Sequence, residues 1–156
     1  MAVFLADNEI DALISEAKPL EPGYGSKLQL KVKLGHKERE MTILGATGDF
    51  KIILRQSLLN QFDFSAILGF TPKNSSLVFR LRRYNGKSHE HTNKLERETF
   101  YDFHIHYATE RYQQSGLRED AYAVATSRYA DLQGALDCLF VDCGLALPSG
   151  EQQLLF

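Results

Sequence analysis

This chain lacks most of the features that would assign a protein to a class at first sight. No apolar stretch is long enough to span a membrane, and residues 1–7 lack the basic start of a signal peptide. The net charge of −2 and the isoelectric point near 6.2 do not favour binding to nucleic acid through overall charge. We therefore expect no membrane contact and no direct nucleic-acid binding.

Cysteine is scarce. The only two, Cys138 and Cys143, fall in one predicted helix, at a spacing that gives poor geometry for a disulfide. We expect both to be reduced core residues, as is usual for a cytoplasmic protein.

The common catalytic motifs are missing as well. The sequence has no His-Glu-x-x-His, no Cys-x-x-Cys and no glycine-rich phosphate loop. We therefore expect no cofactor and no resident metal. Whether the chain is an enzyme stays open at this point, with a non-enzymatic role favoured.

Length and composition favour one domain. A chain of 156 residues, 44% of them hydrophobic, can bury a single sizeable core. Apolar residues at helical spacing predict an N-terminal helix from Asp7 and a closing helix over 128–143. Because a turn-forming run then follows, we expect the domain to cover 1–147 and a tail to cover 148–156.

Alternating apolar and polar residues predict the strands between the two helices. A three-stranded antiparallel meander is expected first, then further strands after a stretch, 62–70, that is ambiguous between a strand and a buried turn. The predicted strands cover 28–34, 40–44, 50–55, 77–84, 100–107 and 121–125, and 87–98 and 109–120 are expected to be polar loops. The fold class is therefore α+β: a single antiparallel sheet of about five to seven strands flanked by N-terminal and C-terminal helices.

Histidines gather in one part of the chain. Four of the five lie at His89, His91, His104 and His106, and a strand would point the last two to the same side. By the same alternation, Arg80 and Arg82 are expected on one face of the preceding strand and Arg83 on the other.

Three interpretations of this histidine group stay open. The side chains can stand on the polar face of a strand whose Phe103, Ile105 and Tyr107 face the core. They can catalyse acid–base cleavage of RNA without a metal, since the pKa of histidine suits that chemistry. They can also hold zinc, with an oxygen from Glu90, Glu96 or Asp102.

The tail carries a short peptide of a known type. Gln152, Leu155 and Phe156 resemble the peptides by which bacterial polymerases and repair proteins dock on the sliding clamp, whereas Gln153 departs from the Leu of the strongest versions. With Leu154, these residues are the predicted clamp-binding set. An apolar pocket would take the leucine and phenylalanine, each contributing about 1.5–3 kcal/mol on burial. The alternatives are that the tail packs on its own domain or is a degradation tag.

A second resemblance lies in the folded part. Residues 79–86, residues 103–107 and the closing helix are similar to small, functionally unassigned bacterial proteins that often look like the effector half of a toxin–antitoxin pair. Together the two resemblances point to the SocB-like toxins.

That resemblance implies a toxin that binds the bacterial DNA sliding clamp and blocks replication by competing with clamp clients. It also implies an antitoxin or proteolytic adaptor as a partner and delivery to a ClpXP-type protease. The alternative function is a toxin-like ribonuclease that uses the histidine group.

Overall fold

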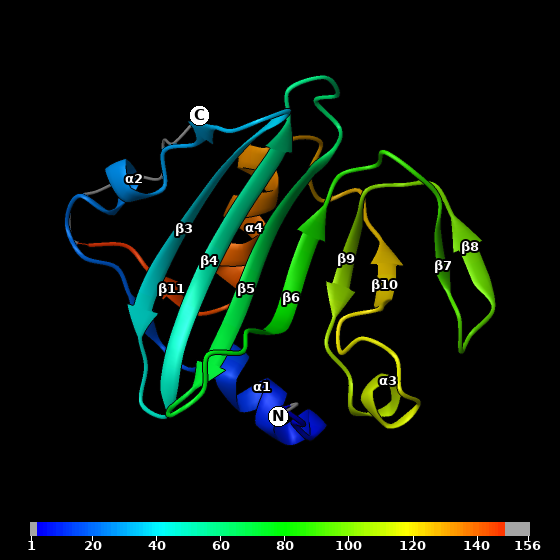
Figure 1. The fold of residues 1–156 in the computed structure, drawn as a ribbon, viewed down its shortest axis with the longest axis horizontal. Helices are drawn as coiled ribbons and strands as arrows, with labels where there is room; N and C mark the ends of the chain where they lie inside the picture. Colours follow the sequence, from blue (N-terminus) through cyan, green and yellow to red (C-terminus); the bar gives the residue numbers. More distant parts are fainter. Residues whose placement is uncertain (1–2, 149–156) are drawn as a thin grey trace.

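The computed structural model describes residues 3–148, and its fold is α+β. A seven-stranded antiparallel sheet has the order β10-β9-β6-β5-β4-β3-β2, which confirms the predicted fold class. Helix α4 lies across one face of the sheet, and the other face is turned toward the viewer in Figure 1. The strands of this sheet are β2 (Lys31–Val32), β3 (His36–Leu44), β4 (Gly48–Ser57), β5 (Phe64–Pro72), β6 (Phe79–Asn85), β9 (His104–Tyr107) and β10 (Tyr122–Ala125).

Smaller elements surround this sheet. A parallel pair joins the two ends of the domain, and an antiparallel hairpin, β7–β8, lies beyond β10 (Figure 1). No helix within residues 3–148 is long and apolar enough to cross a membrane. The remaining elements are α1 (Asp7–Ser15), β1 (Lys18–Pro19), α2 (Tyr24–Lys27), β7 (His91–Asn93), β8 (Glu98–Phe100), α3 (Glu110–Gln114), α4 (Leu132–Asp142) and β11 (Leu145–Ala146).

The core lies between the sheet and helix α4. Every second residue of the central strands is buried there, because side chains alternate between the two faces of a strand. The helix begins at Asp131, whose Oδ1 accepts a hydrogen bond from the backbone N–H of Gly134 at 2.8 Å. Buried members of this layer are Phe50, Ile52 and Leu54 of β4, Ala66 and Leu68 of β5, and Leu132, Ala135, Leu136 and Leu139 of α4.

The predicted strand at 28–34 is wrong. Gly23, at φ 84°, begins the short helix α2, which carries Leu28 into the core as the helix ends. Only Lys31–Val32 pairs with the sheet, and Val32 and Leu34 are 70% and 98% exposed. The second half of the alternation therefore lies at the sheet edge, where no core covers Val32 and Leu34.

The middle of the chain differs from the prediction in ways that create the site. The ambiguous stretch 62–70 is mostly strand β5, and the predicted loop 87–98 contains strand β7. The predicted strand 100–107 is broken into β8 and β9, while 109–120 contains helix α3 rather than only loop. As a result β7 and β8 pair with each other as a separate hairpin beside the main sheet.

A register shift between Leu68 and Gly69 of β5 changes which arginines of β6 lie together. Arg80 pairs with Gly69, but Arg82 pairs with Leu68, so one extra residue stands on β6 between them. The Arg82 guanidinium therefore lies over the Tyr107 ring, 4.7 Å from its centroid, whereas Arg80 contacts the acidic Asp120 from the open face. The prediction that Arg80 and Arg82 share a face is wrong for this reason.

Candidate metal centre

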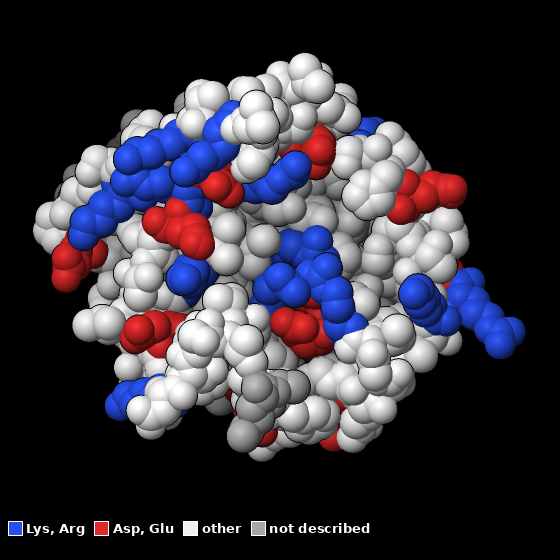
Figure 2. Space-filling view, in the orientation of Figure 1, with Lys and Arg blue, Asp and Glu red and all other residues white. Residues whose placement is uncertain are grey.

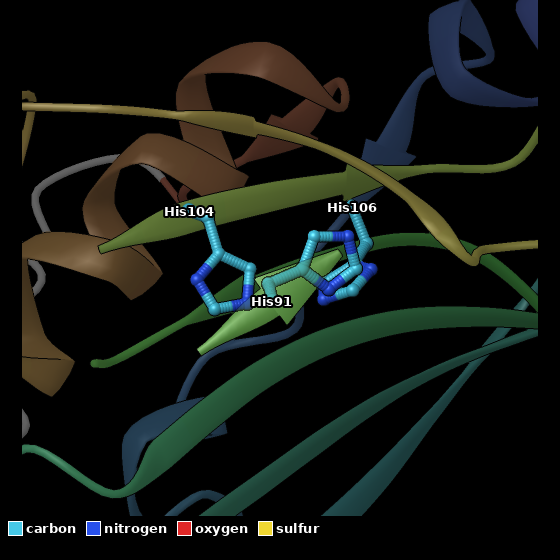
Figure 3. A group of neighbouring side chains, drawn as sticks. All are labelled: His91, His104 and His106. Carbon is cyan, nitrogen blue, oxygen red and sulfur yellow. The ribbon is translucent and has the colours of Figure 1, made fainter. Parts of the chain in front are cut away.

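Three histidines from two elements meet on the open face of the sheet. His104 and His106 stand on β9, and His91 reaches them from β7. One ring nitrogen from each lies within 4.8 Å of the other two. Figure 3 shows the three rings gathered together, with the ring of His91 in front of that of His106 in this view. The ring centroids are 4.9 to 5.2 Å apart.

His104 and His106 lie on the face of β9 away from the core, as one of the three interpretations has it, but they are covered rather than exposed to solvent. Their exposed fractions are 2% and 4%. The β7–β8 hairpin is tied to β10, because Asn93 forms two hydrogen bonds with the backbone of Ala123, at 2.7 and 2.9 Å. Phe100 of the same hairpin packs against His91 and His104. Of the core residues expected opposite, Ile105 is buried, and Phe103 and Tyr107 are half-buried against the core.

The hydrogen bonds fix the tautomer of each ring. His104 Nδ1 lies 2.8 Å from the backbone oxygen of Asp102, and His106 Nδ1 lies 2.7 Å from that of Asp120. A carbonyl oxygen only accepts, so both Nδ1 atoms carry hydrogen and each Nε2 of a neutral ring keeps its lone pair.

His91 follows the same rule with its nitrogens exchanged. Its Nε2 lies 2.8 Å from Oδ1 of Asn93. That atom must be the amide oxygen, because it also accepts the backbone N–H of Ala123 while the Asn93 amide nitrogen donates to the Ala123 carbonyl. His91 therefore donates from Nε2, and a neutral ring keeps the lone pair on Nδ1.

The surroundings keep two of the rings neutral. Burial lowers the pKa of His104 to about 4, although the hydrogen bond to the Asp102 carbonyl opposes this effect. Burial, together with the positive charge of Arg83, lowers the pKa of His106 to about 2. At neutral pH both rings are therefore uncharged, which is the form that binds a metal ion.

The arrangement has the chemistry of a three-histidine metal site. Three imidazole ligands leave one tetrahedral position for water or substrate. A histidine that binds a metal usually donates the N–H of its other ring nitrogen to an oxygen, as all three rings do here. Within residues 3–148, no carboxylate belongs to the cluster. Of the three predicted oxygen donors, Glu96 pairs with Arg111 and accepts from Tyr112, and Glu90 is exposed. Asp102 contributes only its backbone oxygen, to His104.

His89 is the predicted histidine that does not join the cluster. Its Nδ1 lies 3.1 Å from Oγ of Ser88, its side chain is exposed, and it lines the clefts in front of the site. Sequence reasoning missed two residues that matter, Asn93 and Asp120. Both act through contacts with distant segments, and no short motif marks either of them.

Two adjoining clefts open next to the three rings. The larger, of about 480 Å³, is lined by His91 and His106, and the smaller, of about 320 Å³, by His104. They share Arg83 and Arg118. Figure 2 shows lysine and arginine side chains gathered in the hollow near the middle of this face, over β5 and β6. The site is therefore open to ligands and locally basic.

Comparison with protein-family models, with curated proteins and with solved structures finds no match for this chain. The predicted clamp-binding residues, Gln152, Leu154, Leu155 and Phe156, lie outside the described residues. The two cysteines are free, with Cys138 half-buried and Cys143 buried.

Proposed function

We propose that this protein is a metal-dependent hydrolase whose metal ion is held by His91, His104 and His106. The observation that carries the proposal is the hydrogen bonding of the three rings. Each ring donates one N–H to a fixed oxygen, which leaves the other nitrogen of a neutral ring as a possible ligand, and one nitrogen of each ring lies within 4.8 Å of the other two. The proposal departs from our expectation, from the sequence alone, of no resident metal.

The open cleft favours a catalytic over a structural metal. A structural zinc site is closed by four protein ligands, whereas three ligands leave a position for water. A zinc ion held by the three histidines would lower the pKa of a bound water to about 7 and so supply hydroxide near neutral pH. His91 and His106 both line the larger cleft, so a substrate there would lie beside the metal.

The same geometry is less suited to cleavage of RNA by histidines alone. That reaction needs one imidazole as base and one imidazolium as acid. His104 and His106 are buried and uncharged near neutral pH, so neither supplies the acid. Two other histidines of the group line the clefts: the Nε2–H of His91 is already donated to Asn93, and the exposed His89 is not held against the cluster. A ribonuclease at this site would therefore use the metal.

Metal binding by the full chain tests the proposal directly. We expect one equivalent of Zn²⁺ or Co²⁺ in isothermal titration calorimetry, and a visible Co²⁺ spectrum typical of a tetrahedral site. His104→Gln and His106→Gln should each weaken binding on the order of a hundredfold or more, because each removes a ligand. His36→Gln is the matched control, since His36 lies on β3 outside the cluster.

Two results would overturn the proposal. If the chain binds no stoichiometric Zn²⁺, Co²⁺, Ni²⁺, Mn²⁺ or Fe²⁺, the metal centre is ruled out. Binding that is as tight in the two cluster variants as in His36→Gln would also rule it out, because the metal would then be held elsewhere.

We also propose, from the tail sequence, that the chain is a toxin that docks on the bacterial sliding clamp. Gln152, Leu155 and Phe156 support this docking by their likeness to clamp-binding peptides. Occupying the clamp pocket would displace polymerase and repair clients and stop replication. An antitoxin or adaptor would deliver the protein to a ClpXP-type protease, and the toxin would act at the replisome in the cytoplasm.

Binding to purified clamp tests the docking proposal separately from the metal. We expect a dissociation constant in the micromolar range, about −8 kcal/mol, for the full chain. Phe156→Ala and Gln152→Ala should abolish this binding, and Gln153→Ala should change it little because it departs from the motif. Equal binding by Phe156→Ala and the unaltered chain would sink the docking proposal without affecting the metal centre.

A further inference from the structure

We infer that the metal centre acts on phosphate esters, and that Arg83 and Arg118 form the subsite that binds the phosphate. The inference rests on the proposed metal-dependent hydrolase and names its substrate class. It starts from the charges around one buried carboxylate, that of Asp120, which connects the arginines to the histidines.

Three guanidiniums surround the carboxylate of Asp120. Nε of Arg83 donates to Oδ2 at 2.9 Å, Nε of Arg80 is 3.6 Å from the same oxygen, and a terminal nitrogen of Arg118 is 3.5 Å from Oδ1. Glu119 adds a second negative charge, 3.9 Å from Nε of Arg80. Three positive charges therefore face two negative charges, which leaves an excess that favours an anion.

Arg83 has most of its donors available. A guanidinium has five N–H groups, and Arg83 donates only Nε–H within residues 3–148. The carboxylate of Asp120 thus binds the planar guanidinium of Arg83 at its Nε. The two terminal nitrogens form the fork that matches two oxygens of a phosphate.

The position of Arg83 beside the metal ligands is set by the sheet. Arg83 is directly opposite His106 in the antiparallel pairing of β6 with β9. Side chains of directly paired residues lie on one face, with β-carbons about 4.5–5.5 Å apart. An anion bound by Arg83 would therefore lie beside a metal ion held by the three histidines.

The larger cleft has the composition expected of a phosphate site. Its lining includes Arg83, Arg118 and Lys94 but no aspartate or glutamate of the described part of the chain. Its volume of about 480 Å³ lies in the range of about 300–1,000 Å³ usual for small-molecule sites. It therefore has room for a phosphate together with part of the group esterified to it.

The reaction follows from these parts. A metal ion held by His91, His104 and His106 would activate a water molecule, whose oxygen would form a bond to phosphorus as the bond from phosphorus to the leaving alkoxide oxygen breaks. One proton of that water ends on the leaving oxygen, directly or through solvent. Arg83 and Arg118 stabilise the charge on the non-bridging oxygens as it develops. No electron is gained or lost by substrate or protein.

The test uses the full chain loaded with Zn²⁺ and inorganic phosphate as the probe. We expect saturable binding by ³¹P NMR and calorimetry. Arg83→Gln and Arg118→Gln should each weaken this binding about ten- to a hundredfold, because each removes charged hydrogen bonds. Metal content should stay at one equivalent. Arg39→Gln is the matched control, since Arg39 lies on β3 and donates to the backbone of Gln29.

Turnover and competition identify the source of the phosphate. Bis(p-nitrophenyl) phosphate should be hydrolysed faster by the unaltered chain than by Arg118→Gln, whose side chain is half exposed and is the safer variant for folding. A short single-stranded RNA that competes with phosphate better than a mononucleotide would identify a polynucleotide substrate. The reverse order would identify a small phosphate ester.

The outcomes separate this inference from the proposed function. If the chain binds one metal ion but both arginine variants bind phosphate like Arg39→Gln, the phosphate subsite is wrong and the metal centre stands. A metal-loaded chain that binds no phosphate leads to the same conclusion. If no metal binds, the proposed function fails and this inference fails with it.

Discussion

His106 and Asp120 are joined by a hydrogen bond of 2.7 Å, from the ring Nδ1 to the backbone oxygen. The carboxylate of Asp120, which is fully buried, accepts a hydrogen bond from Nε of Arg83. One residue thus orients a candidate metal ligand through its backbone and a candidate phosphate-binding arginine through its carboxylate. Asp120 therefore positions both the candidate metal site and the candidate phosphate site.

The first prediction concerns Asn93, which holds both the hairpin and the His91 ring. Asn93→Ala removes the acceptor for His91 Nε2 and both hydrogen bonds to Ala123. We expect the affinity for Zn²⁺ to fall about ten- to a hundredfold, the range for loss of a residue that orients a metal ligand. Calorimetric titration of Zn²⁺ checks the prediction.

Thr99→Val is the control for Asn93. It removes an exposed hydroxyl pair with Thr92 on the same hairpin and should leave Zn²⁺ affinity within about twofold of the unaltered chain, because surface changes usually have small effects. Equal affinities for Asn93→Ala and Thr99→Val would contradict the role assigned to Asn93.

The second prediction is a loss of stability in acid. Burial holds the pKa of His104 at about 4 and that of His106 at about 2, below the value of about 6.5 expected in the unfolded chain. Between pH 6.5 and 4 the unfolded chain binds protons that the folded chain does not. The free energy of unfolding of the metal-free chain should therefore fall as pH falls, by at most about 1.4 kcal/mol per histidine per pH unit.

Urea unfolding from pH 7 to 4.5, with a chelator present, measures this slope. His104→Gln should have a shallower slope than His36→Gln, because only the former removes one of the buried rings. Parallel pH profiles for the two variants would show that His104 does not account for the acid sensitivity.

The third prediction concerns Lys18, a fully buried lysine between the two ends of the domain. Its Nζ lies 2.7 to 3.0 Å from backbone oxygens near the end of α1 and 2.7 Å from that of Cys143, which ends α4. Lys18→Met leaves these oxygens without a donor, so we expect a loss of about 3 kcal/mol in urea unfolding. Lys27→Met, at an exposed lysine, should cost less than about 0.5 kcal/mol.

Lys18 also predicts a change with alkaline pH. Burial lowers its pKa to about 8, from an ordinary value of 10.5. Above pH 8 the unfolded chain keeps a proton that the folded chain has lost, so the contribution of Lys18 to stability rises with pH up to about 10. The difference in unfolding free energy between the unaltered chain and Lys18→Met should grow over that window. A constant difference would contradict the lowered pKa.

The fourth prediction concerns Tyr129, whose hydroxyl is placed between two strands under the site. The hydroxyl lies 2.8 Å from the backbone oxygen of Asn85 and 2.9 Å from that of His104. Tyr129→Phe leaves both buried oxygens with one donor fewer, so we expect unfolding to become easier by about 1–2 kcal/mol. Tyr101→Phe, at an exposed tyrosine, should be neutral in the same thermal or urea unfolding experiment.

Local patterns predicted the architecture well where one face of an element meets the core. Helix α4 was predicted from its apolar spacing, and β4 from its alternation, because both bury one side against the other. The same reasoning failed at 28–34, where Leu28 enters the core from the end of a helix and Val32 and Leu34 lie at the sheet edge with no core behind them. A pattern of side chains predicts a strand only if a partner surface exists.

The site could be predicted only in part. The sequence pointed to four histidines, of which His91, His104 and His106 form the cluster, and the spacing of the last two predicted their common side. It did not predict their burial, since the β7–β8 hairpin that covers them falls in a stretch that resembles a polar loop. Nor did it predict that Arg80 and Arg83 both lie beside Asp120. An unpredicted bulge on β6 places Arg80 on the face of Arg83 rather than on that of Arg82.

By itself, then, the sequence determined the fold class, the alternation of the central strands and the residue types available for chemistry. These depend on neighbours within a few positions along the chain. Tertiary structure alone decided which ring nitrogens are free, which arginines face the cleft and which residue connects them. Those properties depend on hydrogen bonds between segments far apart in the chain, such as Asn93 with Ala123, and such pairings are set by the packing of the whole sheet.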